Sequence, residues 1–185
     1  TTPPGAPPPR PRPAVVLVHG GPFVRGTRWQ WDADAQFLAS RGYVVVEPEF
    51  RGSDGYGQAH LRAGFRQWGQ AMQDDVADAL LWAVKQGHAD PKRACIAGAS
   101  YGGYATLMGL VRHPDLYRCG AAWVAVTDPL LMYKWTAISD QSDEIRQYDL
   151  PRLIGDPVAD AEQLKATSPV AQAARIKAPV LLAAG

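Results

Sequence analysis

Short apolar runs, separated by turns rich in glycine and proline, divide the chain into alternating strands and helices. The runs predicted as strands are continuous and rich in β-branched or small residues, which is typical of strands buried on both faces. They are Ala14–Val18, Tyr43–Val46, Ala94–Ala97, Gly120–Val126 and Pro179–Ala184. Apolar residues at helical spacing predict helices at Trp31–Ser40, Asp74–Gln86, between Ser100 and His113, and at Ala159–Ala166, with a short helical excursion within Pro129–Asp149.

This alternation predicts βαβ units and therefore a parallel sheet. Because parallel crossovers are right-handed, we predict an α/β fold of three layers with a mostly parallel sheet. Functional sites on such sheets lie at the carboxyl ends of the strands. Two glycine-rich turns are expected there, His19–Pro22 after the first strand and Gly98–Gly103 after the third.

Composition and charge argue against several classes of protein. Of the 185 residues, 46% are hydrophobic and 20% are charged, which is ordinary for a globular domain and argues against disorder. The net charge is +1, from 19 Lys and Arg against 18 Asp and Glu, so nothing predicts nucleic acid or an anionic membrane as a partner. The apolar runs are too short to span a bilayer.

The two cysteines, Cys95 and Cys119, are too few for a disulfide framework, and no Cys/His spacing suggests zinc. Each lies at the start of a predicted strand, where a buried thiol is expected rather than a bridge. The sequence therefore predicts no metal and no cofactor.

The turn after the third strand matches the pattern G-x-S-x-G, from Gly98 to Gly102. A strand before this pattern and a helix after it are the context that a nucleophile elbow requires. Turning directly from strand to helix forces the serine into a strained backbone conformation, and the glycines leave room for the chain to close around it. We predict Ser100 as the nucleophile and the Tyr101 N–H, at the positive end of the helix, as a donor to an oxyanion.

Two other interpretations of this turn stay open. In the first, Ser100 is only the N-cap of the helix. In the second, Gly98 and Gly103 belong to a degenerate dinucleotide fingerprint. Ser100 in place of the middle glycine disfavours that fingerprint, as does the lack of an acid at a strand end about 20 residues further on.

The other glycine-rich turn, His19-Gly20-Gly21-Pro22, is the candidate source of a second oxyanion donor. Acyl transfer needs two donors where negative charge develops, and a backbone N–H after an upstream strand is the usual second one in α/β hydrolases. Gly21 is the candidate because a side chain there would fill the oxyanion space; the alternative is a simple Gly-Pro turn. His19 lies at the wrong strand end for a base, and we interpret it as a residue that organises the loop.

The stretches VHGGPF, FRGSDGYG, WGQAMQDDVADAL, DPKRACIAGASYGGYATL and PVLLAAG, in this order, resemble the catalytic domain of prolyl oligopeptidase-type (S9) serine peptidases. The resemblance covers about residues 14–185 and is nearest to the acylaminoacyl-peptidase-like and dipeptidyl-peptidase-like branch. It implies an α/β-hydrolase fold, cleavage of short peptides, Ser100 as nucleophile, and the N–H groups of Tyr101 and Gly21 as oxyanion donors.

The resemblance also implies a substrate side-chain pocket lined by the segment after the fourth strand, with candidates Val126, Met132, Tyr133 and Trp135. The alternative is that these side chains are ordinary core or cap residues. Residues 1–13 are predicted as a proline-rich lead-in, and residues 14–185 as a partial hydrolase domain whose C-terminal part is missing. A β-propeller is the domain expected before it.

A serine hydroxyl needs a base, and the base needs an orienting acid. The chain order in α/β hydrolases is serine, acid, histidine, and the resemblance places the acid and the histidine beyond Gly185. Within the chain, Asp128 is a plausible acid, whereas His113 is expected about 20 Å from Ser100 along the helix. We expect a serine-peptidase catalytic region that is inactive alone; the alternatives are a carboxylesterase or thioesterase of the same fold, or a non-catalytic domain.

Overall fold

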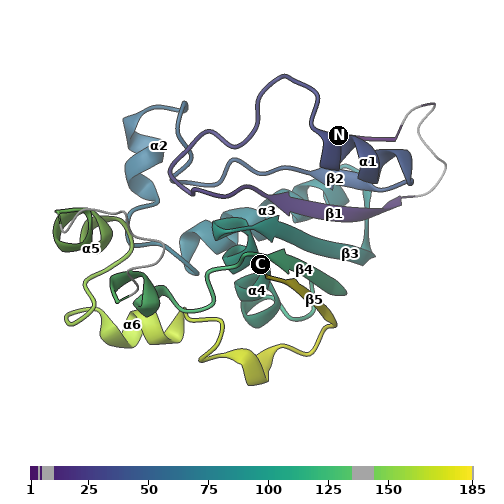
Figure 1. Cartoon of the computed structure of the whole chain (residues 1–185). Coiled ribbons are helices and arrows are strands. Elements are labelled where there is room, and N and C mark those ends of the chain that lie inside the picture. Colours follow the sequence, from purple (N-terminus) through teal and green to yellow (C-terminus); the bar gives the residue numbers. More distant parts are fainter. Residues whose placement is uncertain (4, 6–10, 135–143, 185) are drawn as a thin grey trace.

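The computed structural model describes residues 1–3, 5, 11–134 and 144–184 (Figure 1). Its centre is a five-stranded sheet in the order β2-β1-β3-β4-β5, and every pairing in it is parallel. The strands are β1 (Arg12–Val18), β2 (Val44–Val46), β3 (Ala89–Ala99), β4 (Cys119–Trp123) and β5 (Val180–Ala183). The predicted α/β fold with a parallel sheet is therefore confirmed.

Some strands begin or end at other residues than predicted, because backbone pairing and backbone conformation determine these ends and the apolar run does not. β1 begins at Arg12, two residues early, because Arg12 pairs with Ala89 of β3. β4 ends at Trp123, because the next residue, Val124, has a φ of 44°. A β-branched residue rarely adopts this left-handed conformation. The chain therefore leaves the sheet three residues before the predicted end at Val126.

Two helices, α3 (Ala71–Lys85) and α4 (Tyr101–Arg112), pack on one face of the sheet (Figure 1). Side chains alternate between the two faces along a strand. On the face toward α3 and α4, Val16 and Ile96 are fully buried. This layer is the core of the molecule and supports the strand-to-helix turn between β3 and α4.

The opposite face of the sheet carries α1 (Ala33–Ser40), whose N-cap Asp32 accepts a hydrogen bond of 2.8 Å from the Ala35 N–H. Helices therefore lie on both sides of the sheet, as predicted. Beside α1, a cavity of about 1200 Å³ lies over the strands and is lined largely by apolar side chains, including Leu17 and Leu181.

The remaining helices are short and lie in the connections. α2 (Gln58–Ala63) follows the glycine-rich loop after β2 and was not predicted. The excursion after β4 contains η1 (Pro129–Tyr133), η2 (Ile145–Asp149) and α5 (Leu150–Leu153), and the chain returns through α6 (Ala161–Ala166) and η3 (Ala173–Arg175). In the described part of the chain, no helix is both long and apolar enough to cross a membrane.

The cysteines correct the expectation of buried thiols. Cys95 and Cys119 form a disulfide, with Cα atoms 4.8 Å apart. The reason is strand order: β3 and β4 are neighbours, and their register places these two residues opposite each other. Each cysteine alone suggested a buried thiol, and only the pairing of the two strands brings the sulfurs together.

Replacing both cysteines with alanine should lower the free energy of unfolding by about 3 kcal/mol, because the bridge closes a loop between residues 24 apart in the sequence and restricts the unfolded chain. Denaturant unfolding of the oxidised protein and the double variant measures this difference. Reduced wild-type protein, the matched control, should unfold near the double variant. A denatured but unreduced chain in which both thiols react with an alkylating reagent would contradict the bridge.

Candidate active site

Ser100 lies at the turn from β3 into α4, with φ 56° and ψ −118°. A positive φ is strained for a residue with a side chain and recurs at functional sites. The residue is exposed, and its side chain makes no capping hydrogen bond to α4. The structure therefore contradicts the interpretation of Ser100 as a mere N-cap.

The glycines around Ser100 are required by close backbone packing. A Cβ on Gly98 would lie 2.5 Å from the carbonyl oxygen of Val18, at the end of β1, and a Cβ on Gly102 would overlap the same oxygen. On the other side, a Cβ on Gly103 would lie 2.9 Å from the Cα atom of Ala125. The turn is thus wedged between the end of β1 and the segment after β4.

Tyr101 can contribute to the site only through its backbone. It is the first residue of α4, and the N–H groups of a first turn have no acceptor within the helix. Its side chain is buried, with ring centroids 5.4 Å from Phe50 and 4.7 Å from Trp68, and burial raises the pKa of its hydroxyl. The aromatic packing fixes the start of α4 and leaves the Tyr101 N–H near Ser100.

The His19–Thr27 segment, which we call the strap, follows β1 and lies against the elbow. A Cβ on Gly20 would lie 3.3 Å from the Ala99 carbonyl oxygen and 3.5 Å from Ser100 Cβ. The strap that holds Gly21 therefore adjoins Ser100, as the two predicted oxyanion donors require. Gly21 has a φ of 115°, and a Cβ there would lie 2.7 Å from Val24 Cγ2. The positive φ and the close contact with Val24 therefore require a glycine at position 21, independently of the predicted space for an oxyanion.

Sequence reasoning missed the polar residues that hold the strap. Glu49 accepts hydrogen bonds from the Thr27 N–H and, at 2.6 Å, from the Thr27 hydroxyl. Burial raises the pKa of the Glu49 carboxyl, but the Thr27 hydrogen bonds and the nearby His19 outweigh it, so the pKa is lowered. The position of Glu49, three residues after the end of β2 and so near the carboxyl edge of the sheet, is the signal that could have identified it.

The proposed pocket residues lie beside the core. Val126, Met132 and Tyr133 are partly buried and pack against it, and the Tyr133 hydroxyl donates to the Gly155 carbonyl. Burial raises the pKa of Tyr133 to about 12. Trp135 lies outside the described residues.

The candidate acid and base, Asp128 and His113, each contact other groups in the described part of the chain. Asp128 accepts hydrogen bonds from the Leu130 N–H at 3.1 Å and the Ser168 hydroxyl at 3.3 Å, so it caps the start of η1. His113 ends α4, about 18 Å from Ser100 along a helix of 12 residues. Its Nε2 atom lies 3.6 Å from Asp74, and burial lowers its pKa. In the described part of the chain, no histidine hydrogen-bonds to Ser100.

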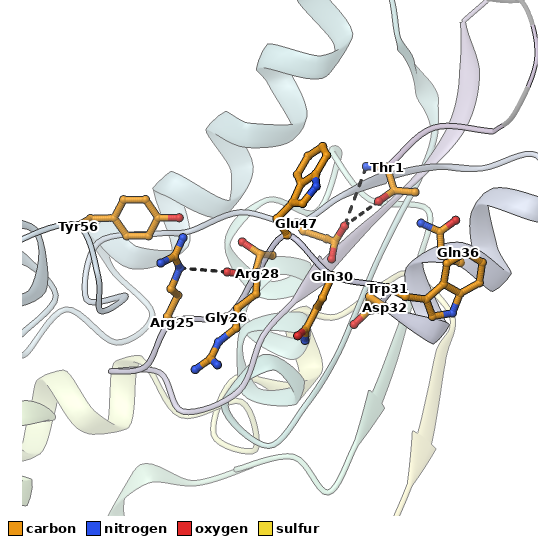
Figure 2. Close-up of a pocket in the computed structure, with 12 residues that line it drawn as sticks. Thr1, Arg25, Gly26, Arg28, Gln30, Trp31, Asp32, Gln36, Glu47 and Tyr56 are labelled. Carbon is orange, nitrogen blue, oxygen red and sulfur yellow. Dashed lines mark hydrogen bonds and ion pairs between the residues drawn. The ribbon is translucent and has the colours of Figure 1, made fainter.

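A cavity of about 800 Å³ lies outside the elbow, between residues 25–32 and the β2 end (Figure 2). Figure 2 shows Arg25 extending toward Tyr56, with its guanidinium 5.9 Å from the ring centroid, and Glu47 facing Thr1. Ser100 does not line this cavity. The cavity is therefore separate from the elbow, although the strap contributes to both.

A serine with strained backbone at a strand-to-helix turn, on a parallel sheet and beside a glycine-rich strap, defines the elbow of an α/β hydrolase. The model of the prolyl oligopeptidase family matches residues 29–185, and the chain belongs to that family.

Its relatives are peptidases of much greater length. The chain is 39% identical to dipeptidyl aminopeptidase BIII of Pseudoxanthomonas mexicana over 95% of its own residues. Among solved structures, it is similar to a puromycin-hydrolyzing peptidase of Mycobacterium tuberculosis, with 34% identity, 96% coverage and a TM-score of 0.83. The chain is also similar to an acylaminoacyl peptidase of Pyrococcus horikoshii, with 28% identity over 99% of its own residues and a TM-score of 0.84. The chain spans 25%, 26% and 28% of these three relatives.

Replacing Gly102 with alanine should destabilise the protein by about 3 kcal/mol, because the new methyl group meets the Val18 carbonyl. In an ordinary helix interior the same change stabilises by about 1 kcal/mol, so the sign itself tests the close contact. Gly87→Ala is the control. Position 87 has open space for a Cβ but a φ of 76°, so this substitution should lower the free energy of unfolding by only about 1 kcal/mol. Thermal and denaturant unfolding measure both; equal stability of the two variants would contradict the packing argument.

Proposed function

We propose that the chain is the nucleophile-bearing part of a serine peptidase that acts through an acyl-enzyme on Ser100. The observation that supports this proposal is the exposed, strained serine beside the strap, in a chain of the prolyl oligopeptidase family. Ser100 Oγ bonds to the carbonyl carbon of a peptide as its proton passes to a base. The N–H groups of Tyr101 and Gly21 donate to the oxyanion. The C–N bond then breaks, the amine takes the proton, and water releases the acyl group.

The base and its orienting acid belong, in this proposal, to parts of the protein outside the 185 residues. The only histidine after Ser100 is His113, at the far end of α4. The substrate is a short peptide whose side chain contacts Val126, Met132, Tyr133 and Trp135. A β-propeller before the hydrolase region would restrict access to short chains.

Two other functions remain candidates. A carboxylesterase or thioesterase would use the same serine and donors, since the fold alone does not separate amide from ester hydrolysis. A non-catalytic domain would keep the elbow without reacting. The strain at Ser100 favours a reacting serine over this last candidate, because strain of this kind costs about 1–3 kcal/mol and persists at functional sites.

A fluorophosphonate probe should label the intact protein at Ser100, because the probe reacts with activated serines and places its phosphoryl oxygen in the oxyanion site. Ser100→Ala should abolish labelling while leaving the unfolding midpoint nearly unchanged. Ser40→Ala, at the exposed end of α1 on the opposite face of the sheet, is a control for the loss of another serine. Peptide mapping of the labelled protein measures the site, and labelling that persists in Ser100→Ala would show that the nucleophile is another residue.

Aminoacyl amides and p-nitrophenyl esters distinguish a peptidase from an esterase. The intact protein should hydrolyse both, and the 185-residue chain alone should hydrolyse both slowly, because no histidine of the described chain reaches Ser100. Steady-state assays of the two proteins at equal concentration measure this. Cleavage of esters only would favour the esterase, and rapid turnover by the 185-residue chain would contradict an external base.

A further inference from the structure

The imidazole of His19, at the start of the strap, is mostly buried and is contacted from several directions. Its ring stacks on Phe50, with centroids 4.4 Å apart and an interplanar angle of 13°. The strap returns directly across the ring at Gly26, where a Cβ would overlap the imidazole. His19 therefore has little freedom to rotate, and both of its ring nitrogens point at defined partners.

The partners fix which nitrogen holds the proton. Nδ1 lies 2.7 Å from the carbonyl oxygen of Gly20, and Nε2 lies 3.0 Å from the hydroxyl of Ser53. A carbonyl oxygen only accepts, so Nδ1 must donate to it. In the neutral ring, Nε2 then accepts from the Ser53 hydroxyl, which is fully buried. If Nε2 is also protonated, it faces Glu49 Oε2 at 3.6 Å, and the Nδ1 hydrogen bond remains.

The Gly20 carbonyl belongs to the same peptide unit as the Gly21 N–H. Among the described residues only the Gly21–Pro22 bond is cis, so the Gly20–Gly21 peptide is trans. In a planar trans peptide the C=O and N–H bonds point in opposite directions. A hydrogen bond that turns the Gly20 carbonyl toward His19 therefore turns the Gly21 N–H away from His19. Gly20 itself lies against Ser100. The orientation of the Gly20–Gly21 peptide therefore decides whether its C=O or its N–H group points toward Ser100.

The far end of the strap is tied to the same side chains. Glu49 accepts hydrogen bonds from the N–H groups of Gly26 and Thr27 and from the Thr27 hydroxyl, and its Oε2 atom lies 3.6 Å from His19 Nε2. One carboxylate thus anchors the point at which the strap crosses the imidazole. Both ends of the strap are fixed relative to one ring, and the Gly20–Gly21 peptide lies between them.

We propose that His19 is a positioning residue for the reaction: through its Nδ1–H bond to the Gly20 carbonyl, it aims the Gly21 N–H at the oxyanion. This inference rests on the proposed function, since it gives that function one of its two donors. His19 contacts no substrate and transfers no proton. Ser53 and Glu49 hold the ring in the tautomer and orientation that the Nδ1–H hydrogen bond to Gly20 requires.

Two amide variants separate the two ring nitrogens. The amide nitrogen of asparagine lies where imidazole Nδ1 lies, whereas that of glutamine lies near Nε2. His19→Asn should keep the bond to the Gly20 carbonyl and label with fluorophosphonate within about tenfold of the wild-type rate. His19→Gln should be labelled about 100-fold more slowly than the wild type, since the loss of one oxyanion donor lowers the reaction rate by about 10²–10³-fold. The loss should fall on the reaction rate of the bound probe and not on its binding.

The outcomes are distinct. Equal labelling of the glutamine variant and the wild type would overturn the positioning role while leaving the proposed function intact, and absence of labelling in the wild type would overturn both. A second measurement does not depend on activity or on the folding of a variant. Nitrogen-15 NMR of His19 in the wild-type chain should show Nδ1 protonated and, at neutral charge, Nε2 unprotonated. The opposite tautomer would overturn the inference.

Discussion

The close approach of the Val18 carbonyl to the turn between β3 and α4 is the constraint on which the rest of the site depends. Gly98 and Gly102 face this one oxygen, and neither position has room for a Cβ. Because the end of β1 is this close, the chain must turn from strand to helix within a single residue, and that residue is the strained Ser100. The same approach brings Gly20, two residues after Val18, against Ser100. The nucleophile candidate and the strap are therefore two results of one packing contact between neighbouring parallel strands.

Much of this arrangement could be predicted because its signals are local. The apolar runs gave the strands, since a strand buried on both faces needs consecutive apolar residues. Glycines at fixed offsets around Ser100 gave the elbow, since only glycine tolerates such contact. The carboxyl ends of β1 and β3 meet because the two strands are parallel neighbours, which the βαβ pattern also implies.

What could not be predicted depends on contacts between distant residues. Strand order determines that Cys95 meets Cys119, and neither cysteine encodes it. Glu49 and Ser53 follow β2 in a loop whose sequence does not show that it folds under the strap toward His19. Val124 resembles the strand residues around it, and only the packing of the chain against Gly103 shows why it leaves the sheet.

The site divides into parts with different physical requirements. A nucleophile and backbone donors need rigid positions, and the chain supplies these through glycine contacts, a buried aromatic cluster and the His19 ring. A base must exchange protons with substrate and therefore needs access and a pKa near neutrality. His19 is unsuited to that task, because both of its ring nitrogens are already engaged by Gly20 and Ser53. His19, whose neighbour Gly20 packs against Ser100, therefore serves to position the strap. The proton chemistry of the proposed reaction must use another residue, so rigid positioning and proton transfer fall to different residues.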